Sequence, residues 1–342
     1  MRKSILIGGT AIPAGQRATV DLDVPDLYTH TGISLPVHVI HGKKDGPVLF
    51  LSGALHGDEI NGVEIIRRIL KSKRINKISG TLLAVPVVNI YGFINKTRYL
   101  PDRRDLNRSF PGSETGSLAA RMANVFLKEI VSKCSHGIDL HTGAIHRNNL
   151  PQVRALMDDT ETERVARAFS LPVILNTDIV AGSLRESAEK LGVTVIVYEA
   201  GEALRFDEDS IRSGVKGVKS VMREIGMLPG LKKTRKKIEP LVAKSSTWVR
   251  APQSGILRTK KGLGAKVRKN ELMGVISDPF GEKEEEIRAT ANGIIIGRTI
   301  IPLVNEGEAL FHIARFKGAD DASDQADEIH NHQTPPTDDP KT

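Results

Sequence analysis

The sequence predicts an α/β protein with a mixed, mainly parallel sheet flanked by helices, followed by a small all-β domain. Between about residues 36 and 230, short apolar runs alternate with amphipathic helical patterns, which is typical of a parallel sheet with helices packed on it. After residue 231 the pattern changes to short strands separated by glycines. A chain of 342 residues with 39% hydrophobic and 26% charged residues can bury one large core or two cores.

The individual elements follow from local patterns. Residues 18–24 alternate apolar and polar side chains, which predicts a strand added at an edge of the sheet. Apolar runs of strand length predict buried strands, and apolar residues at helical spacing predict amphipathic helices. We therefore expect strands over Pro47–Leu55, Thr81–Asn89, Gly137–His141, Val173–Asn176 and Thr194–Glu199, and helices over Glu59–Leu70 and Leu118–Val131.

Composition divides the chain into three parts. A basic linker, Lys232–Lys237, separates a first domain over residues 1–230 from a β domain over residues 231–316. Residues 317–342 are acidic and almost without apolar side chains. Such a segment cannot bury enough apolar surface to offset its ordering entropy, so we expect a disordered tail.

The β domain contains a weak internal repeat. Ala251–Leu257 recurs in form as Ala289–Ile295, and two such β units resemble the barrel-sandwich fold of lipoyl and biotinyl domains. Lys283 lies in the hairpin between the two units, but it lacks the sequence setting of a lysine that carries a swinging arm. We therefore expect a lid, an oligomerisation surface or a substrate-docking domain rather than a carrier.

The charge distribution bears on the partner. The net charge is +8 at pH 7, and because the tail is acidic the rest of the chain is more basic than the whole. A basic body suits an acidic small molecule or peptide, or nucleic acid, and it is also common as a plain solvated surface. Aromatic residues make up only 4% of the chain and no RNA-stacking motif is present, which argues against nucleic acid.

The sequence lacks the signals of a membrane or secreted protein, which bears on the cellular compartment. No apolar run approaches the roughly 18 to 20 residues of a membrane span, and the first apolar stretch is too short for a signal peptide. The single cysteine, Cys134, excludes an internal disulfide and agrees with a reducing compartment. We expect a cytoplasmic protein without a membrane segment; a homo-oligomer stays open.

Metal-binding side chains follow two of the predicted strands. His56 and Glu59 come directly after the first buried strand, and His141 ends the strand that begins at Gly137. Carboxyl ends of parallel strands meet at one edge of a sheet, where sites of α/β proteins lie. Two histidines and one glutamate are a known zinc set with a position left for water. Asp139 alternates onto the same face as His141, where it could line the site or support a ligand.

A further carboxylate follows a third strand. Glu199 comes directly after the apolar run that begins at Thr194. Partial burial there would raise the pKa of a carboxyl group toward values useful for proton transfer. Activation of a metal-bound water requires a general base, so we expect Glu199 to act as general base and acid.

A loop rich in arginine suggests anion recognition. Residues 97–112 contain Arg98, Arg103, Arg104 and Arg108 among turn residues. Guanidinium groups bind carboxylates bidentately, and the nearby Asn107 adds an amide donor. Such a segment is equally often only a solvated surface.

Together these motifs resemble the succinylglutamate desuccinylase and aspartoacylase family, a branch of the zinc carboxypeptidase superfamily. The resemblance rests on His56–Glu59, Asp105–Arg108, Asp139–Gly143 and Glu199–Gly201, and it covers about residues 36–220 in motif order. It implies a zinc carboxypeptidase-like fold, in which residues 1–230 would be the zinc-dependent hydrolase domain. The appended β domain is also similar to one found in that family.

The resemblance implies that one zinc ion per chain is bound by His56, Glu59 and His141. It also implies that Glu199 activates the water and then protonates the leaving amine. The expected activity is hydrolysis of an amide bond with release of a carboxylate from an N-acyl amino acid. A zinc carboxypeptidase that removes a C-terminal residue from a peptide would use the same residues. A non-catalytic, zinc-stabilised protein that binds an acidic partner or RNA would be expected to lack part of this set.

The resemblance also implies roles for residues of the arginine-rich loop. Asn107 and Arg108 match the pair that holds the carboxylate of the substrate's amino-acid part. Arg98 matches the arginine that polarises the scissile carbonyl. Its spacing to Arg108 is longer than in the family, so Arg103 or Arg104 could take that role instead.

Substrate specificity would come from loops near the site. Residues 144–150 and 182–185 could contact the acyl or peptide part of a small-molecule amide or peptide that carries a carboxylate. Within the first loop we interpret His146 and Arg147 as ordinary polar loop residues rather than substrate ligands.

Overall fold

The computed structural model describes residues 2–230 and 239–316, so the predicted basic linker and acidic tail lie outside the described residues. Its strands are β1 Ile5–Ile7, β2 Thr10–Ile12, β3 Arg17–Asp23, β4 Ser34–His41, β5 Lys44–Gly53, β6 Ser79–Val85, β7 His136–Gly143, β8 Arg147–Ala155, β9 Val173–Asn176, β10 Thr194–Glu202, β11 Leu241–Ala243, β12 Ser245–Arg250, β13 Gly255–Thr259, β14 Lys266–Val267, β15 Leu272–Ser277, β16 Glu284–Arg288, β17 Gly293–Thr299, β18 Leu303–Val304 and β19 Ala309–Arg315. Its helices are α1 Asn61–Lys71, α2 Ile90–Asn95, α3 Leu118–Glu129, α4 Thr160–Ala168, α5 Leu184–Lys190 and α6 Glu208–Glu224, with short 3-10 helices η1 Lys73–Lys77, η2 Leu106–Arg108 and η3 Val131–Lys133.

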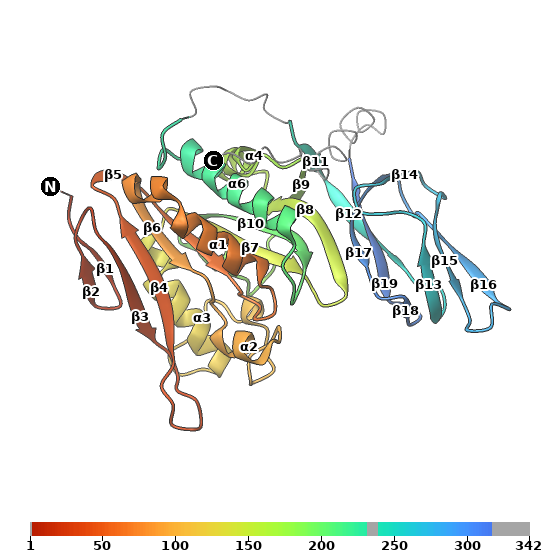
Figure 1. Cartoon of the computed structure of the whole chain (residues 1–342), viewed down its shortest axis with the longest axis horizontal. Coiled ribbons are helices and arrows are strands. Elements are labelled where there is room, and N and C mark those ends of the chain that lie inside the picture. The colour runs from red at the N-terminus through yellow and green to blue at the C-terminus, as the bar shows by residue number, and fades with distance from the viewer. Residues whose placement is uncertain (1, 231–238, 317–342) are drawn as a thin grey trace.

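A mixed sheet of 13 strands forms the centre of the protein (Figure 1). Its main path runs β12-β19-β17-β8-β10-β7-β5-β6-β4-β3. Strands β6, β5, β7 and β10 are parallel, whereas β4 and β8 run antiparallel on either side of them. The predicted mixed α/β sheet is confirmed, but only its centre is mainly parallel.

The predicted elements agree with this sheet except at some boundaries. The expected edge strand is β3, which ends the sheet, and the strand expected over Val173–Asn176 is β9. The helix expected over Leu118–Val131 ends at Glu129 as α3, because the chain tightens into η3 after it.

Helices cover both faces of the sheet (Figure 1). In the buried strand β5, Leu49 and Leu51 pack with α1, α4 and α6 in one core, whereas Phe50 packs with α3 and α5 in another. This alternation follows from the period of two in a strand, and it explains why a central strand is apolar on both faces. The strand ends are thereby fixed between two packed layers, which holds any site at that edge in place.

The C-terminal segment continues the same sheet. Strand β17 pairs with β8, and β11 pairs with β9, so strands from beyond residue 239 extend the sheet of the first part. Strands β16, β15, β13 and β18 form a second sheet, and Met273, Leu310 and Phe311 belong to a core of this segment. The domain division near residue 231 and the barrel-sandwich architecture stay predictions, since strands from both sides of that boundary share one sheet.

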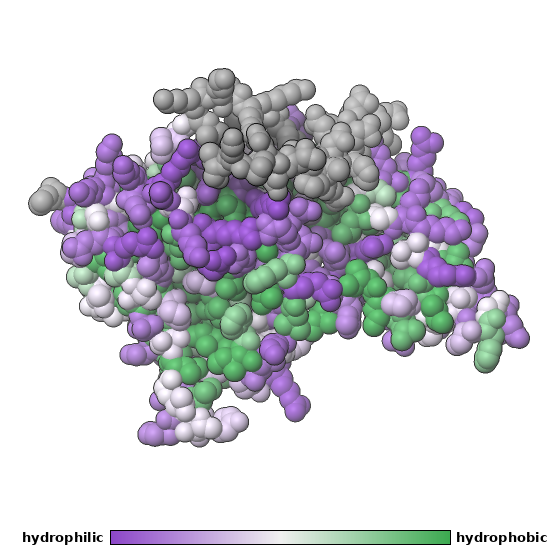
Figure 2. Space-filling view, viewed as in Figure 1, coloured by the Kyte–Doolittle hydropathy of each residue, from purple (hydrophilic) through white to green (hydrophobic). Residues whose placement is uncertain are grey.

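Hydrophilic side chains spread over the face formed by α1 and α6 (Figure 2). On this face Arg68 of α1 forms ion pairs with Glu64 and with Glu208 of α6. Among residues 2–230 and 239–316, no helix combines the length and the apolar character needed to cross a membrane.

Candidate active site

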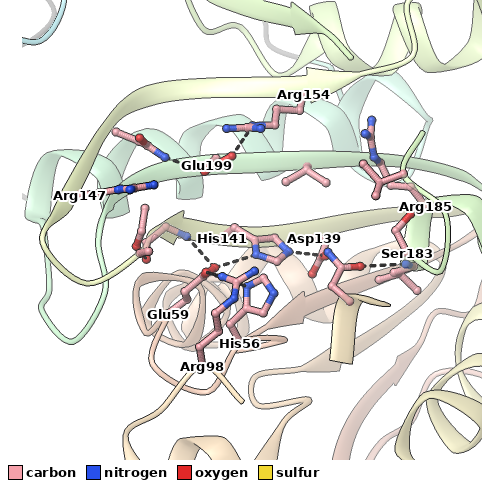
Figure 3. A pocket seen from close by; sticks show the side chains of 18 of the residues that line it. His56, Glu59, Arg98, Asp139, His141, Arg147, Arg154, Ser183, Arg185 and Glu199 are labelled. Carbon is pink, nitrogen blue, oxygen red and sulfur yellow. Dashed lines mark hydrogen bonds and ion pairs between the residues drawn. The ribbon is translucent and has the colours of Figure 1, made fainter. Parts of the chain in front are cut away.

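The candidate site lies where the parallel strands β5, β7 and β10 end. Parallel strands deliver their carboxyl ends to one edge of a sheet, so side chains there converge. His56 and Glu59 follow β5, His141 lies near the end of β7, and Glu199 of β10 is its register partner. All four line one cavity of about 270 Å³ (Figure 3).

The three predicted metal ligands form a buried cluster. His56 Nδ1 lies 2.7 Å from Glu59 Oε1, and His141 Nδ1 lies 2.7 Å from Glu59 Oε2. One candidate ligand atom from each residue lies within 4.8 Å of the others. Their side chains are 2% to 7% exposed, so a bound cation would be largely shielded from solvent.

Two aspartates hold the outer nitrogens of these histidines. Asp139 Oδ2 lies 2.6 Å from His141 Nε2, and Asp105 Oδ1 lies 3.2 Å from His56 Nε2. Ser52 donates a hydrogen bond of 2.7 Å to Asp139. In metal sites a ligating histidine commonly donates its other ring N–H to a carboxylate, which fixes the tautomer and turns the free nitrogen to the metal. Both Nδ1 atoms are therefore oriented as metal ligands require.

The charges of the cluster favour a bound cation. Burial alone would raise the pKa of Glu59, but the adjacent His56 and His141 outweigh burial and hold this pKa well below its usual range. Burial alone would lower the pKa of His141, but Asp139 and Glu59 outweigh burial and raise this pKa well above its usual value. With Asp105 and Asp139, three carboxylates lie against the two imidazoles and stabilise positive charge, which fits a zinc-type set of two histidines and one glutamate.

The turn that presents His56 depends on a glycine. A side chain at Gly57 would place its Cβ 2.0 Å from the backbone carbon of Gly92 in α2. The amide of Glu59 donates to the carbonyl of His56 over 3.1 Å and closes a turn before α1 begins. The predicted helix therefore starts two residues later than expected, because Glu59 belongs to this turn.

Glu199 lies on the other side of the cavity from the cluster (Figure 3). Asn149 Nδ2 donates a hydrogen bond of 2.6 Å to Glu199 Oε1. Arg154 forms a close ion pair with the other carboxylate oxygen, although its Nε–H is not aligned for a hydrogen bond. The carboxyl group is 15% exposed, so it is partly buried as the sequence predicts, but its partners are polar.

The structure separates the predicted arginines. Arg98 and Arg108 line the cavity, and Arg98 Nη1 lies 3.2 Å from Glu59 Oε1. The alternatives Arg103 and Arg104 are exposed and do not line this cavity. Arg103 occupies a turn with φ of 62°, and the side chain of Arg104 is 64% exposed. Their placement in the turn before η2 removes them from the described site.

The start of α5 forms another wall of the cavity. Asn107 Oδ1 accepts a hydrogen bond of 2.9 Å from the amide of Leu184, and Ser183 caps the helix. Arg185 Nη2 donates a hydrogen bond of 3.0 Å to the carbonyl of Asp178. Its Nη1 atom is buried and has no hydrogen-bond partner among the described residues. Burial, with the nearby Arg154, lowers the pKa of Arg185. A buried guanidinium with an unpaired nitrogen is suited to an anionic group of a ligand.

The loop expected over residues 144–150 is partly a strand, because β8 begins at Arg147. His146 donates its backbone N–H over 2.9 Å to the buried carboxylate of Glu202 and does not line the cavity. Arg147 does line the cavity, and its guanidinium carbon lies 5.2 Å from the ring centroid of Trp248. Arg147 therefore lies in a strand and not in a loop, and the interpretation that it does not bind the substrate stays a prediction.

The sequence placed Asn149 only in a predicted specificity loop and did not predict its contact with Glu199, and it did not indicate Arg154 or Trp248 as cavity residues. Asn149 and Arg154 belong to β8, whose pairing with β10 is a long-range contact. Trp248 comes from β12 of the C-terminal segment and is the single tryptophan of the chain. A single tryptophan in a chain can mark a functional position, but the sequence did not indicate where Trp248 lies in the fold.

Comparison with known proteins agrees with this geometry. Residues 45–225, slightly more than half of the chain, match the succinylglutamate desuccinylase/aspartoacylase catalytic domain. The chain belongs to the succinylglutamate desuccinylase/aspartoacylase family. The resemblance inferred from the motifs is confirmed, and the matched region contains all the strand ends that supply the cluster and Glu199.

Relatives and solved structures extend the likeness. The N-alpha-acetyl-L-2,4-diaminobutyric acid deacetylase of Halomonas elongata is 26% identical over 296 residues, which cover 82% of this chain and 86% of that protein. A succinylglutamate desuccinylase/aspartoacylase from Rhodobacter sphaeroides has a TM-score of 0.78 at 22% identity, covering 88% of this chain and 96% of that one. The product-bound ectoine utilization protein EutE (DoeB) from Ruegeria pomeroyi has a TM-score of 0.78 at 24% identity, covering 88% and 97%. These likenesses confirm the family fold.

Proposed function

We propose that this family member is a zinc-dependent hydrolase that cleaves the amide bond of a small N-acyl amino acid. The proposal rests on the buried cluster of His56, Glu59 and His141, which shares one cavity with Glu199. Hydrolytic zinc sites combine such a ligand set with a nearby proton acceptor. The Halomonas elongata relative, a deacetylase of an N-acetylated amino acid, supports the same reaction class.

His56, Glu59 and His141 would hold the zinc ion. When bound, zinc supplies a Lewis acid that polarises the substrate carbonyl and lowers the pKa of a water molecule. Asp105 and Asp139 keep both imidazoles oriented, since each accepts the ring N–H that points away from the ligand position. Metal binding by these residues would release the protons that they hold in its absence.

Glu199 would take a proton from the attacking water and deliver it to the leaving amine. A carboxylate in this role must stand within hydrogen-bond reach of the attacking water, directly or through one further water molecule. Arg98, which lies beside the cluster, would donate to the carbonyl oxygen as negative charge develops on it. Collapse of the tetrahedral intermediate then breaks the C–N bond and releases a carboxylate and an amine.

The substrate carboxylate would bind between η2 and α5. Asn107 uses its oxygen to accept from Leu184, so its Nδ2 donors are left for a ligand. Arg108 adds a guanidinium at the same end of the cavity, and Arg185 offers its unpaired nitrogen. These donors support a substrate that carries at least one carboxylate.

The size of the cavity favours a small substrate over a peptide. Its volume of about 270 Å³ lies just below the usual range for ligand pockets. Trp248, from the C-terminal segment, adds an aromatic wall to this space. A short acyl group and one amino acid would fill it, whereas a carboxypeptidase must also admit the preceding residues of its peptide. We therefore favour hydrolysis of an N-acyl amino acid over removal of a C-terminal residue from a peptide.

The test combines metal analysis with two substrate panels. We expect near one zinc per chain, and zinc-dependent release of carboxylate from N-acyl amino acids but not from short peptides. His56→Ala should lose both metal and activity. His136→Ala is the matched control, because His136 lies on the same strand as His141 but pairs with Glu161 outside the cluster. Cleavage of the peptide panel alone would favour the carboxypeptidase, and a protein that binds no metal would refute the proposal.

A further inference from the structure

A row of residues crosses the sheet from the C-terminal segment to the catalytic cavity. Trp248 of β12 pairs with His312 of β19, and His312 pairs with Gly297 of β17. Gly297 in turn pairs with Asn149 of β8. Directly opposed residues in neighbouring strands project to the same face of a sheet. The row therefore ends at Asn149, the residue that donates to Glu199.

Gly297 leaves the space that the Asn149 carboxamide occupies. A Cβ at residue 297 would lie 2.7 Å from Asn149 Oδ1 and 3.3 Å from His312 Cβ. The first distance is shorter than van der Waals contact, so any side chain at this position must displace the carboxamide. At its other end, the carboxamide donates the hydrogen bond of 2.6 Å to Glu199. The amide group is thus confined between a C-terminal strand and the catalytic carboxylate.

The backbone alone does not fix the direction of Glu199. The pairing of β10 with β8 shifts register between Glu199 and Gly201, so the ladder is irregular where the carboxylate must be aimed. The terminal torsion of a glutamate is broad, so partners decide the orientation of its carboxylate. Arg154 contacts one oxygen and Asn149 the other. Removal of the Asn149 donor would leave Oε1 without this restraint.

We propose that Asn149 is a positioning residue for Glu199 and that strand β17 fixes Asn149 through Gly297. The inference rests on the proposed function, in which Glu199 accepts and delivers the proton. It gives the C-terminal segment a part in catalysis, because strand pairing from this segment sets the direction of the carboxylate, and this part requires no contact between the described residues of the segment and the reacting atoms. It also explains why a glycine stands in the middle of β17, where a side chain would normally strengthen the strand.

The first test removes the Asn149 donor. Asn149→Asp keeps the shape of the side chain but lacks the amide N–H, and Asn149→Ala removes the whole group. Loss of a hydrogen bond to a charged group should lower kcat by roughly 10- to 100-fold. KM should change by less than about threefold, because in this proposal Asn149 acts on Glu199 and not on the substrate. Zinc content should be unchanged, and crystal structures of both variants should show the Glu199 carboxylate displaced.

The second test alters the support from β17. In Gly297→Ala the added carbon meets the end of a flexible side chain, so the fold should tolerate it while the carboxamide moves. We expect a lower kcat, and no further loss when Gly297→Ala is added to Asn149→Ala, because the displaced group is then absent. Arg298→Ala is the control: Arg298 is the next residue of β17 and donates to Thr259 instead. It should leave kcat unchanged.

The outcomes separate the two proposals. Wild-type kcat in Asn149→Ala, together with an inactive Glu199→Gln, would overturn the positioning role and leave the proposed function standing. Full turnover in Glu199→Gln would overturn the proposed function and this inference with it. Loss of zinc or of the folded state in both Asn149→Asp and Gly297→Ala would also overturn the inference, because it would assign these residues a structural role only.

Discussion

His312 makes the stability of this protein depend on pH within a defined window. Burial, and then the nearby Arg154 and Arg147, lower the pKa of His312 to about 3. An unfolded histidine has a pKa of about 6.5. Between these two values the unfolded state binds a proton that the folded state does not, so stability present above pH 6.5 is lost as the pH falls toward 3.

The size of the effect follows from these two values. At pH 5, protonation favours the unfolded state by a factor of about 30, which corresponds to about 2 kcal/mol. His312 is only 5% exposed, so solvent screening takes little from this figure. At neutral pH and above, the contribution is close to zero because both states are neutral.

The substitution His312→Phe keeps a flat ring against Trp248 but removes the titrating group. The rings of His312 and Trp248 are stacked with centroids 4.3 Å apart and planes 6° apart, so a phenyl ring can occupy the same place. Trp248 is the only tryptophan, and its fluorescence reports unfolding in urea. Between pH 7.5 and pH 5 the wild type should lose about 2 kcal/mol more than the variant. An equal loss in both proteins would show that the titration of His312 does not cause the pH dependence of stability.

Three further predictions concern the site. Glu199→Gln should retain zinc but lose turnover by at least about 100-fold, as shown by metal analysis and initial rates, and unchanged rates would remove Glu199 from the mechanism. Arg185→Met should raise KM by roughly tenfold for substrates with a second anionic group and leave kcat nearly constant, whereas an unaltered KM would show that the unpaired nitrogen binds no substrate. Gly57→Ala should lower the thermal midpoint by several degrees and reduce zinc content, because its Cβ meets backbone at 2.0 Å; a variant of normal stability would show that the turn can adapt.

The strands of the central sheet were predictable because their apolar character is local. Strand β9 matches its expected range, and the alternating pattern of residues 18–24 correctly indicated an edge strand. Strand β8 was taken partly for a loop, because Arg147–Ala155 contains a proline and several polar residues. Three of those polar side chains, Arg147, Asn149 and Arg154, line the cavity, so function has interrupted the apolar periodicity on which the prediction depends.

The site was predictable to the extent that its residues follow apolar strands. His56, His141 and Glu199 each stand at a strand end, and the topology of a parallel sheet then brings them together. The contact of Asn149 with Glu199 was not predictable, because it joins residues 50 positions apart across an antiparallel pairing. Nothing local in the sequence encodes which strand a polar segment will pair with.

The contribution of Trp248 depends on an even more distant pairing. The C-terminal strands reach the cavity only because β17 pairs with β8 and β12 lies beyond β19 in the same sheet. The repeat in this segment indicated short β units but gave no partner strand for them. Composition therefore showed where the chain changes character, and it did not show that the sheet continues across that change.

The shared sheet also has a consequence for how the protein can be divided or inherited. A chain that ended at residue 230 would leave the backbone groups of β8 and β9 that now pair with β17 and β11 without partners. Unpaired strand edges are templates for intermolecular pairing, so we expect such a fragment to aggregate rather than to persist as a small enzyme. Exchange of C-terminal segments between relatives would succeed only where the incoming strand matches β8 in register and brings a small residue opposite Asn149. We therefore expect the sequences of the two parts of the chain to change together among relatives.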